Sequence, residues 1–359
     1  MPSSYKYITD DKIQSIQNRL YEAVPLTGTI ISGTYADANV RNYSHDRFQS
    51  VYDYPVLSSS ANDIVDIAFG YCSGSNLSSS AHLLNTEKQL NYTQFAQIFQ
   101  GFDITGTIQL FDQDGNINDG GTKLKECAFI FLSRTVVKDG IKRGSFSATF
   151  LTGGSWASPS GRLEINDTHA VNSYFVNSPV GEWSYLSGST DALQGKVGLI
   201  FYGPGLVVLT GSLFTSSSGG ATPVFVSSSA DPNRTYNQAM TASTLSASAN
   251  GLRRRIVNMS FVNTTELNSQ VFFLDVGPNE FNYSSNPTYL SASKIRTKDD
   301  PTDNSVAYIT ELGLYSADNE LIANGKFSEP LKKTIGQPLS IRARIDFWYT
   351  KENLWYGRK

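Results

Sequence analysis

Few residues of this chain are placed for catalytic or metal chemistry. The three histidines, His45, His82 and His169, each lie in polar, loop-like sequence, without a second ligand or a nucleophile at a useful spacing. No phosphate-binding loop, GxSxG, HExxH or GxGxxG motif occurs in the strand-to-helix context that it requires. The sequence therefore predicts no catalytic residue, no cofactor and no small-molecule substrate, and we expect a protein that is not an enzyme.

The best candidate for an ion site is the segment DQDGNINDGG at 112–121. Side-chain oxygens, which calcium prefers, recur there at every second residue: Asp112, Asp114, Asn116 and Asn118. The segment departs from an EF-hand loop because Gly115 comes too early, Ile117 replaces the turn glycine and Lys123 replaces the closing carboxylate. A solvated hairpin turn explains the same residues and is the favoured interpretation.

Two pairs of carboxylates have the residue type that a glycosidase uses. Such an enzyme places two carboxyl groups on either side of the scissile bond. Asp63 with Asp66, and Asp299 with Asp300, are the pairs that could be considered. No aromatic platform is tied to either pair by sequence, so a carbohydrate-active enzyme is the weakest of the functions that we consider.

Composition and charge favour an all-β protein and exclude a nucleic-acid partner. Only 17% of the 359 residues are charged and the formal net charge is -3, while Gly (29), Tyr (19) and Phe (20) are abundant. The isoelectric point near 5.7 gives no basic footprint for binding phosphates. The basic run Arg253–Arg255 opens an apolar segment, so we interpret it as a strand entry with solvated or interface-facing arginines.

The two cysteines, Cys72 and Cys127, have neither CxxC spacing nor a histidine partner. In a chain without a recognisable secretory start, two free, half-buried thiols are favoured over a disulfide. Residues 1–9 do not resemble a signal peptide, and no apolar stretch is long enough to cross a membrane. We therefore expect no membrane partner.

The expected elements begin with a short amphipathic helix at 11–23. Apolar residues recur there at helical spacing: Ile13, Ile16, Leu20 and Val24. Because isolated helices of this length are marginal, the helix must pack on the body or on another subunit. Residues 28–57 show no sustained period and indicate an extended arm or long loop, and lying across a neighbouring subunit would be one use for it.

Strands dominate the following part of the chain. A second helix is predicted at 87–99, where Gly101 stops it. Apolar runs separated by turn sequences predict strands at 63–71, 105–111, 126–133, 145–151, 196–201 and 206–214. The serine-rich sequence at 215–234 predicts a domain boundary or a surface loop.

The last third has the clearest strand patterns. Strands are predicted at 255–262 and 271–276, and a hairpin at 307–330. The hairpin's expected core residues are Leu312, Leu314, Leu321, Ala323 and Phe327, with Gly313 and Gly325 permitting close backbone approach. In LSIRARIDF (339–347) apolar and polar residues alternate strictly, which is typical of a half-buried antiparallel strand.

These elements predict a mainly β protein with an antiparallel sandwich-type body, two short helices, an extended N-terminal arm and an aromatic C-terminal tail. We expect the helix and arm at 1–60, a first β-rich half at 61–215, a second at 235–350 and the tail at 351–359. The two halves could form one composite domain.

The hairpin carries a resemblance to a known group of proteins. AYITELGLYSADNELIANGKFSEPLKK (307–333), followed by LSIRARIDF, resembles a segment of virion structural proteins of tailed bacteriophages, especially contractile-tailed ones. A similar pattern occurs in the N-terminal attachment domain of phage tail-collar fibre proteins. Upstream segments agree with the first group in a consistent order: DIVDIAFGYCSGS (63–75), NYTQFAQIFQG (91–101), GLIFYGPGLVVLTGSLF (198–214) and EFNYSSNPTY (280–289).

The resemblance implies a structural protein of the virion, placed in the neck, collar, tail or baseplate and assembled in the cytoplasm of the bacterial host. The expected partners are copies of the chain itself, as a homo-oligomer or ring, and other virion proteins. Large apolar residues near both ends are the candidate interface residues: Trp348, Tyr349, Leu354, Trp355, Tyr356, Ile13, Ile16 and Leu20. Packing of the tail within its own chain explains the same rings equally well.

A receptor- or glycan-binding module of a tail fibre or cell-surface appendage is the alternative function. It is supported by the supply of Trp and Tyr and by the loops rich in Ser and Asn.

Overall fold

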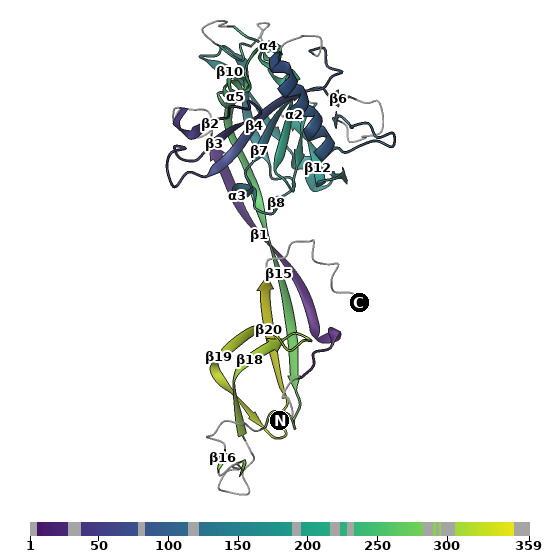
Figure 1. Ribbon diagram of the computed structural model, residues 1–359, viewed down its shortest axis with the longest axis vertical. Helices are drawn as coiled ribbons and strands as arrows, with labels where there is room; N and C mark the ends of the chain where they lie inside the picture. Colours follow the sequence, from purple (N-terminus) through teal and green to yellow (C-terminus); the bar gives the residue numbers. More distant parts are fainter. Residues whose placement is uncertain are drawn as a thin grey trace. The chain divides into compact units, whose positions relative to one another are not determined.

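The structure is a computed structural model that describes residues 6–27, 37–77, 83–113, 122–188, 195–215, 223–227, 233–282, 290–291, 294–295 and 306–347. Within these ranges the chain is mainly β, with antiparallel strands and four α-helices (Figure 1), which confirms the predicted β-rich class. The two short helices of the prediction are therefore too few for the described residues.

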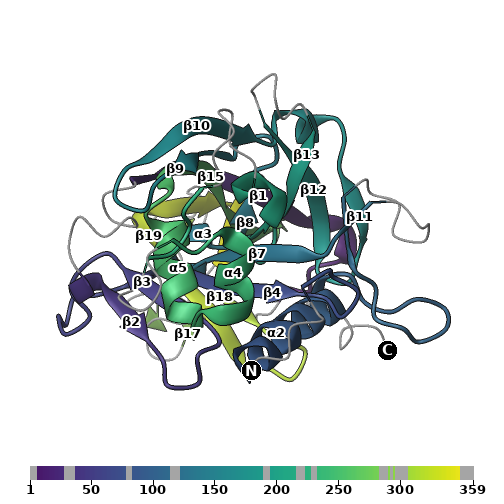
Figure 2. The same ribbon diagram turned by 90° about the horizontal axis from the view of Figure 1, so that it is seen from above.

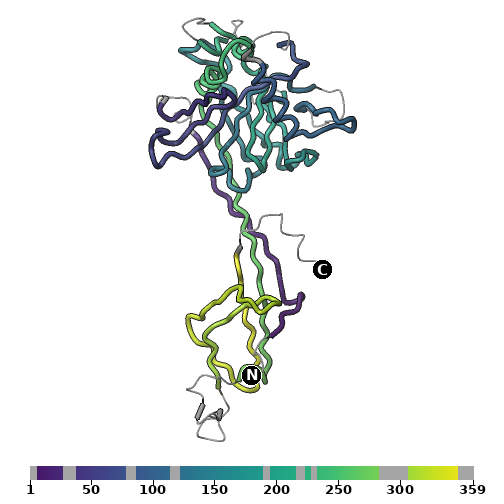
Figure 3. The backbone as a smooth tube through the Cα atoms, in the orientation of Figure 1, coloured from purple at the N-terminus to yellow at the C-terminus, as the bar shows by residue number. Residues whose placement is uncertain are grey.

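The chain divides into two compact units. Unit 1 consists of Met1–Asn18 and Glu266–Lys359, and unit 2 of Arg19–Thr265. The chain passes between the units inside β1 (Ile13–Thr27) and again inside β15 (Ile256–Val276) (Figure 3). This division differs from the expected boundary at 215–235, because residues on both sides of that serine-rich segment belong to unit 2.

Unit 2 is built on an antiparallel sheet with five central strands in the order β12, β13, β14, β7 and β4. Their bounds are β4 (Asp63–Tyr71), β7 (Glu126–Leu132), β12 (Gly181–Gly188), β13 (Lys196–Phe201) and β14 (Leu206–Thr210). Each apart from β12 coincides with, or lies inside, a predicted strand. The predicted strand at 206–214 is too long, since a 3-10 helix (Gly211–Phe214) follows β14.

Further strands extend the sheet on both sides, and other short elements complete unit 2. Beyond β4 lie β3 (Gln49–Tyr52) and β2 (Val40–Asn42), and beyond β12 lie β10 (Pro159–Asn166), β9 (Ser147–Gly154) and β15. The remaining pieces of unit 2 are β5 (Phe111–Asp112), β6 (Lys123–Leu124), β8 (Gly140–Ile141), β11 (Phe175–Ser178), α3 (Arg134–Val137) and a 3-10 helix (Thr168–Val171). The expected strand at 105–111 is wrong, since its first residues form a turn.

Two hydrophobic clusters cover the two faces of the central strands. Side chains alternate along β7, so Phe129 joins one cluster and Ile130 the other. The cluster of Phe129 packs under α2 (Leu83–Phe99), which confirms the helix expected at 87–99. The cluster of Ile130 packs under α4 (Tyr236–Ala242) and α5 (Leu245–Arg253). Figure 2 shows these helices with the strands of unit 2. Because both faces are covered, the central strands are continuous apolar runs.

The sheet of unit 2 bends so that its two ends share one core. Phe150 of β9, Ile165 of β10 and Met259 of β15 belong to the same cluster as Ile67 of β4. Close contact between layers also depends on Gly70, because a Cβ there would lie 2.8 Å from the Lys88 carbonyl oxygen and the Tyr92 nitrogen. The glycine therefore lets α2 lie directly on β4.

Local capping fixes the starts of α4 and α5, two short helices that are not among the expected elements. The Thr235 hydroxyl accepts from the Gln238 N–H while the Gln238 side chain accepts from the Thr235 N–H, which is a capping box at the start of α4. The Thr244 hydroxyl accepts from the Ala247 N–H at the start of α5, and the Asp46 carboxylate accepts from the Leu245 N–H at 2.9 Å. Polar residues at these caps mark where the helices begin.

In unit 1, β15 pairs with β20 (Leu339–Phe347) over nine register positions, from Asn268 with Phe347 to Val276 with Leu339. The predicted alternation of β20 is confirmed within 339–346, since the apolar residues are buried or half-buried and the polar residues between them are exposed. The predicted hairpin is also present, as β18 (Val306–Tyr315) and β19 (Leu321–Thr334). Two short strands, β16 (Leu290–Ser291) and β17 (Lys294–Ile295), form a further pair.

The expected N-terminal helix is wrong. A 3-10 turn (Asp10–Lys12) leads into β1, a strand of 15 residues, although the spacing of Ile13, Ile16 and Leu20 fits a helix. Most residues of β1 are half-buried or exposed, so the rest of the chain covers little of this segment. An extended segment can instead form hydrogen bonds with β15. Pro25 is compatible with this position because β1 is the last strand of the sheet order, and prolines in sheets are found essentially on edge strands.

The expected arm at 28–57 is wrong for its described part, 37–57. This part forms a 3-10 turn (Asp37–Asn39), β2 and β3, and Val51 is fully buried in the core of unit 2. The strands expected at 255–262 and 271–276 are one strand, β15, which continues through the polar residues between them. Pairing with other strands on both sides of this polar stretch explains why it stays extended.

Candidate functional site

The structure brings His169 close to a serine, which no spacing in the sequence indicates. His169 Nε2 lies 3.2 Å from Ser184 Oγ, and the His169 ring stacks on Tyr185 with 3.8 Å between centroids. Ser184 is fully buried, and its hydroxyl donates to the Ser173 carbonyl at 3.2 Å. The two side chains have the spacing of a nucleophile and its base. A nucleophile must also reach its substrate, however, and the buried Ser184 hydroxyl is not accessible to one.

A buried carboxylate completes this polar cluster. Asp167 accepts hydrogen bonds from the N–H groups of Gly144 (2.9 Å) and Phe146 (2.8 Å) and from the Tyr202 hydroxyl (2.8 Å). Burial raises the pKa of Asp167 and lowers the pKa of His169, so both groups are shifted toward their neutral forms. The cluster is best explained as a support for the turn at 142–146.

The acidic pair at the start of β4 has perturbed protonation. Burial, and next the charge of Asp66, raises the pKa of Asp63 to about 6. Burial also raises the pKa of Asp66, although the Ser50 hydroxyl donates to it. Asp63 Oδ1 is buried with no hydrogen-bond partner among the residues that the structure describes. Asp63 therefore holds a proton at a pH at which an exposed aspartate would lose it; the second pair, at 299–300, lies outside the described residues.

The basic run at 253–255 is built into the fold, which corrects the expectation of solvated or interface-facing arginines for two of its members. Arg255 is 1% exposed and donates to the carbonyls of Leu151, Gly153 and Val224, each at 2.8 Å. Arg253 is also buried, whereas Arg254 is exposed and lies over the Trp156 ring. Arg255 therefore joins β9 to the segment before α4 by its guanidinium fork.

Asp112, one of the four calcium-ligand candidates, forms an ion pair. It is fully buried, and its carboxylate lies 3.0 Å from Lys123 Nζ, its direct partner in the β5–β6 register. The other three candidate ligands, Asp114, Asn116 and Asn118, lie outside the described residues. Within the described ranges, no group of three or more His, Cys, Asp or Glu residues could hold a metal ion.

The predicted interface residues divide between two regions. Trp348, Tyr349, Leu354, Trp355 and Tyr356 lie outside the described residues. Ile13 and Ile16 are half-buried on β1 and Leu20 is 55% exposed, so they do not form the expected helical stripe. Cys72 and Cys127 are free thiols as expected, and more deeply buried than expected.

Apolar surface left uncovered in unit 1 is the clearest functional feature. Both hydrophobic clusters of the described chain lie wholly in unit 2. The buried apolar side chains described in unit 1 are Val271, Val276, Ala307 and Ile341. Large apolar side chains there remain exposed: Tyr7, Phe281, Tyr308, Tyr315, Leu321, Ile322 and Ile335. The described part of unit 1 therefore lacks a hydrophobic core comparable to those of unit 2.

The β18–β19 hairpin carries several of the exposed apolar side chains described in unit 1. Leu321 is 54% and Ile322 66% exposed, and Leu312, Leu314, Ala323 and Phe327 are only half-buried. The expectation that these residues form a core is wrong, and so is close backbone approach at Gly325, where a Cβ would meet no atom within 4 Å. Within the described residues β18 and β19 form a two-stranded sheet, and such a hairpin alone is marginally stable.

Polar contacts hold the base of the hairpin. Lys333 is 1% exposed, and its Nζ donates to Asn282 Oδ1 at 3.0 Å and to the Pro278 carbonyl at 3.1 Å. Elsewhere in unit 1, Lys12 pairs with Asp275 at 2.7 Å near the end of β15. The Lys333 contacts tie the hairpin to residues 278–282 without covering its apolar side chains.

Comparisons with known proteins find no match: no family model, no curated protein and no solved structure is similar to this chain. Among the described residues, no helix has the length and apolar character needed to span a bilayer.

Proposed function

We propose that this chain is a structural, non-enzymatic subunit of a tailed-phage virion and that it assembles as a multimer through unit 1. The observation that supports this proposal best is the apolar surface of unit 1, where the described residues form no hydrophobic cluster. The resemblance of 307–333 to virion structural proteins supports the phage setting, with a place in the neck, collar, tail or baseplate.

The partner proposed for this surface is a second copy of the chain. Within the described residues, β18 and β19 pair only with each other, so each strand has one edge without a strand partner. Long unpaired edges are templates for pairing with another chain. Every copy carries the same two edges and the same exposed side chains, so repeated contacts between copies cover them in a ring or another closed assembly.

Incorporation into particles tests this function. In a phage that encodes the chain, the gene would be deleted and the protein supplied from a plasmid, either complete or without residues 306–334. We expect purified particles to contain only the complete chain, while the shortened protein keeps unit 2 folded, as judged by circular dichroism.

A control variant, L57S/I104S, changes two fully exposed apolar residues of unit 2 and should enter particles normally. Equal amounts of the shortened and complete chains in particles would refute assembly through the hairpin. Absence of the complete chain from particles would refute the virion role itself.

A further inference from the structure

The two strands of the β18–β19 hairpin differ in regularity. Their register shifts twice, and both times the inserted residues belong to β19. At the first shift, residues 327–330 of β19 stand against the single residue Thr310 of β18, and at the second shift Ile322 of β19 is the inserted residue. Inserted residues bend the strand that carries them. β19 is therefore the irregular strand, whereas β18 runs without an insertion from Val306 to Leu314.

Features that discourage pairing with another chain are concentrated on β19. Edge strands in natural proteins are protected by proline, by lysine and by bulges. β19 carries Pro330 within its first insertion, together with the exposed Lys326 and Lys332. On β18, Glu311 is the one charged residue, and that strand contains no proline. The outer edge of β18 is thus the less protected edge of the hairpin.

Two further edge strands of unit 1 are protected as well. Within the described residues, β20 and β1 each pair with β15 alone. Charged residues or proline interrupt both strands: Arg342, Arg344 and Asp346 on β20, and Arg19, Glu22 and Pro25 on β1. Among these strands, β18 therefore offers the most favourable edge to a second chain.

The open edge of β18 is the same on every copy of the chain. We infer that it pairs antiparallel with β18 of a second copy across a two-fold axis, an inference that rests on the proposed assembly through unit 1 and names its strand. Such a contact is self-complementary, since each copy presents the same residues to the other. It joins the two hairpins into one sheet in the order β19, β18, β18, β19. Sheets of more than two strands are stable where a lone hairpin is marginal.

The sequence of β18 selects the register of this pairing. Hydrogen-bonded and non-hydrogen-bonded pairs alternate along an antiparallel ladder, so a two-fold axis must pass where one residue lies opposite its own copy. With Thr310 at the axis, the whole stretch 306–314 is paired, and Tyr308 of each copy lies opposite Leu312 of the other. Aromatic and aliphatic residues stabilise such cross-strand pairs. With Glu311 at the axis, two carboxylates would face each other, which is destabilising. We therefore expect Thr310 at the axis.

Disulfide crosslinking of the full chain tests the strand and its register. Facing residues of an antiparallel pair have Cα atoms about 4.5–5.5 Å apart, which a disulfide can span. T310C should therefore form a covalent dimer on mild oxidation. Y308C alone should form none, but a mixture of Y308C with L312C should, because these two positions face each other across the axis. The wild type is the blank, since Cys72 and Cys127 are buried.

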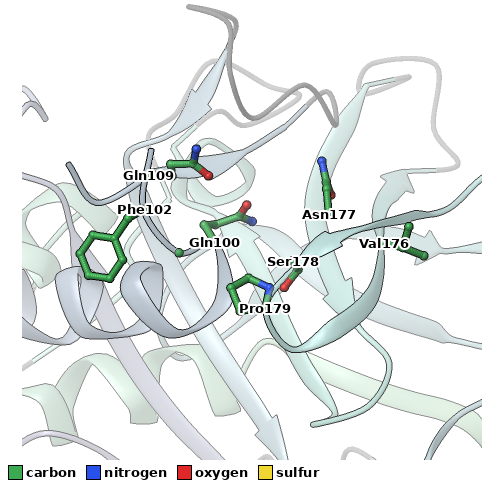
Figure 4. A pocket seen from close by; sticks show the side chains of 8 residues that line it. Gln100, Phe102, Gln109, Val176, Asn177, Ser178 and Pro179 are labelled. Carbon is green, nitrogen blue, oxygen red and sulfur yellow. The ribbon is translucent and has the colours of Figure 1, made fainter. Parts of the chain in front are cut away.

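Sedimentation velocity tests the same contact without a crosslink. Tyr308 is 52% exposed, and the two-fold axis repeats its contact with Leu312. The variant Y308S should therefore raise the dissociation constant about tenfold. The matched control is F102S, because the Phe102 ring is 53% exposed and lies beside a pocket of unit 2 (Figure 4). This control should associate as the wild type does.

The outcomes separate this pairing from the proposed function. A chain that forms multimers, while T310C gives no covalent dimer and Y308S associates as the wild type does, would overturn the pairing of β18 and leave assembly through another surface of unit 1. A single-chain mass at every concentration would refute both. Covalent dimers from T310C and from the Y308C–L312C mixture, with none from Y308C alone, would establish the pairing.

Discussion

Replacing Leu321 and Ile322 of β19 by serine should weaken self-association about thirty-fold. The two side chains are 54% and 66% exposed, so roughly half of each remains for a second copy to cover. Complete burial of a Leu or Ile side chain contributes ~2 kcal/mol. Covering the exposed halves therefore contributes ~1 kcal/mol each, or ~2 kcal/mol per contact between copies, and each 1.4 kcal/mol is about a factor of ten in the dissociation constant.

Sedimentation velocity over a range of concentrations would give the dissociation constants of the wild type and of L321S/I322S. The control is L57S/I104S, the same two substitutions at fully exposed positions of unit 2, for which we expect no change. Circular dichroism would verify that unit 2 remains folded. Equal dissociation constants for the wild type and L321S/I322S would refute the reasoning, since the side chains would then stay in water in the assembly.

Three further predictions concern unit 2. Burial lowers the pKa of Lys88 to about 7, whereas an unfolded lysine titrates near 10.5. Between these two pKa values the unfolded state binds more protons than the folded state, so the free energy of unfolding should rise with pH. The rise is at most about 1.4 kcal/mol per pH unit. The variant K88M should remove this rise, as measured by denaturant titrations at several pH values. Asp63 has its pKa raised to about 6, so the folded state binds more protons than the unfolded state from about pH 4 to 6. The contribution of Asp63 to the free energy of unfolding should therefore fall as the pH rises from about 4 to 6. The variant D63N should be ~1 kcal/mol more stable than the wild type at pH 7. The same pH dependence of stability in both proteins would count against the raised pKa. R255M removes hydrogen bonds to three carbonyls and should lose ~3 kcal/mol of stability. R255K should recover only part of this loss because an ammonium lacks the guanidinium fork, and full recovery by lysine would show that charge alone matters.

Strands with simple burial could be predicted from the sequence. β4 and β20 have the bounds that their patterns indicate, because a strand buried on both faces is a continuous apolar run and a half-buried one alternates. The turn of the hairpin is equally clear in the sequence. There the Ser316 hydroxyl accepts from the N–H groups of Asp318 and Glu320, and Asn319 takes a positive φ of +64°.

Features set by distant partners could not be predicted in this way. The apolar spacing of β1 fits a helix, and only a partner strand far along the chain makes it extended. The Thr235–Gln238 capping box is a readable signal for α4, and Tyr236, Ala239 and Met240 recur at helical spacing, but the helix is only seven residues long. His169 meets Ser184 only because the 3-10 helix at 168–171 folds against β12.

The exposed apolar surface of the hairpin could not be predicted from the sequence either. The apolar pattern of Leu312, Leu314 and Phe327 is that of a buried face, and it says nothing about which molecule covers that face. Likewise Gln100 follows the apolar end of α2, and only the folded chain shows that its buried amide has no partner among the described residues.

The mass of the purified chain as a function of concentration, combined with hydrogen exchange of residues 306–334, tests the proposed assembly most directly. We predict a mass that rises to a fixed multiple of one chain, with the amides of β18 and β19 protected only in the multimer. A single-chain mass at every concentration, with those amides already protected, would contradict the proposal, because unit 1 would then cover its own apolar surface.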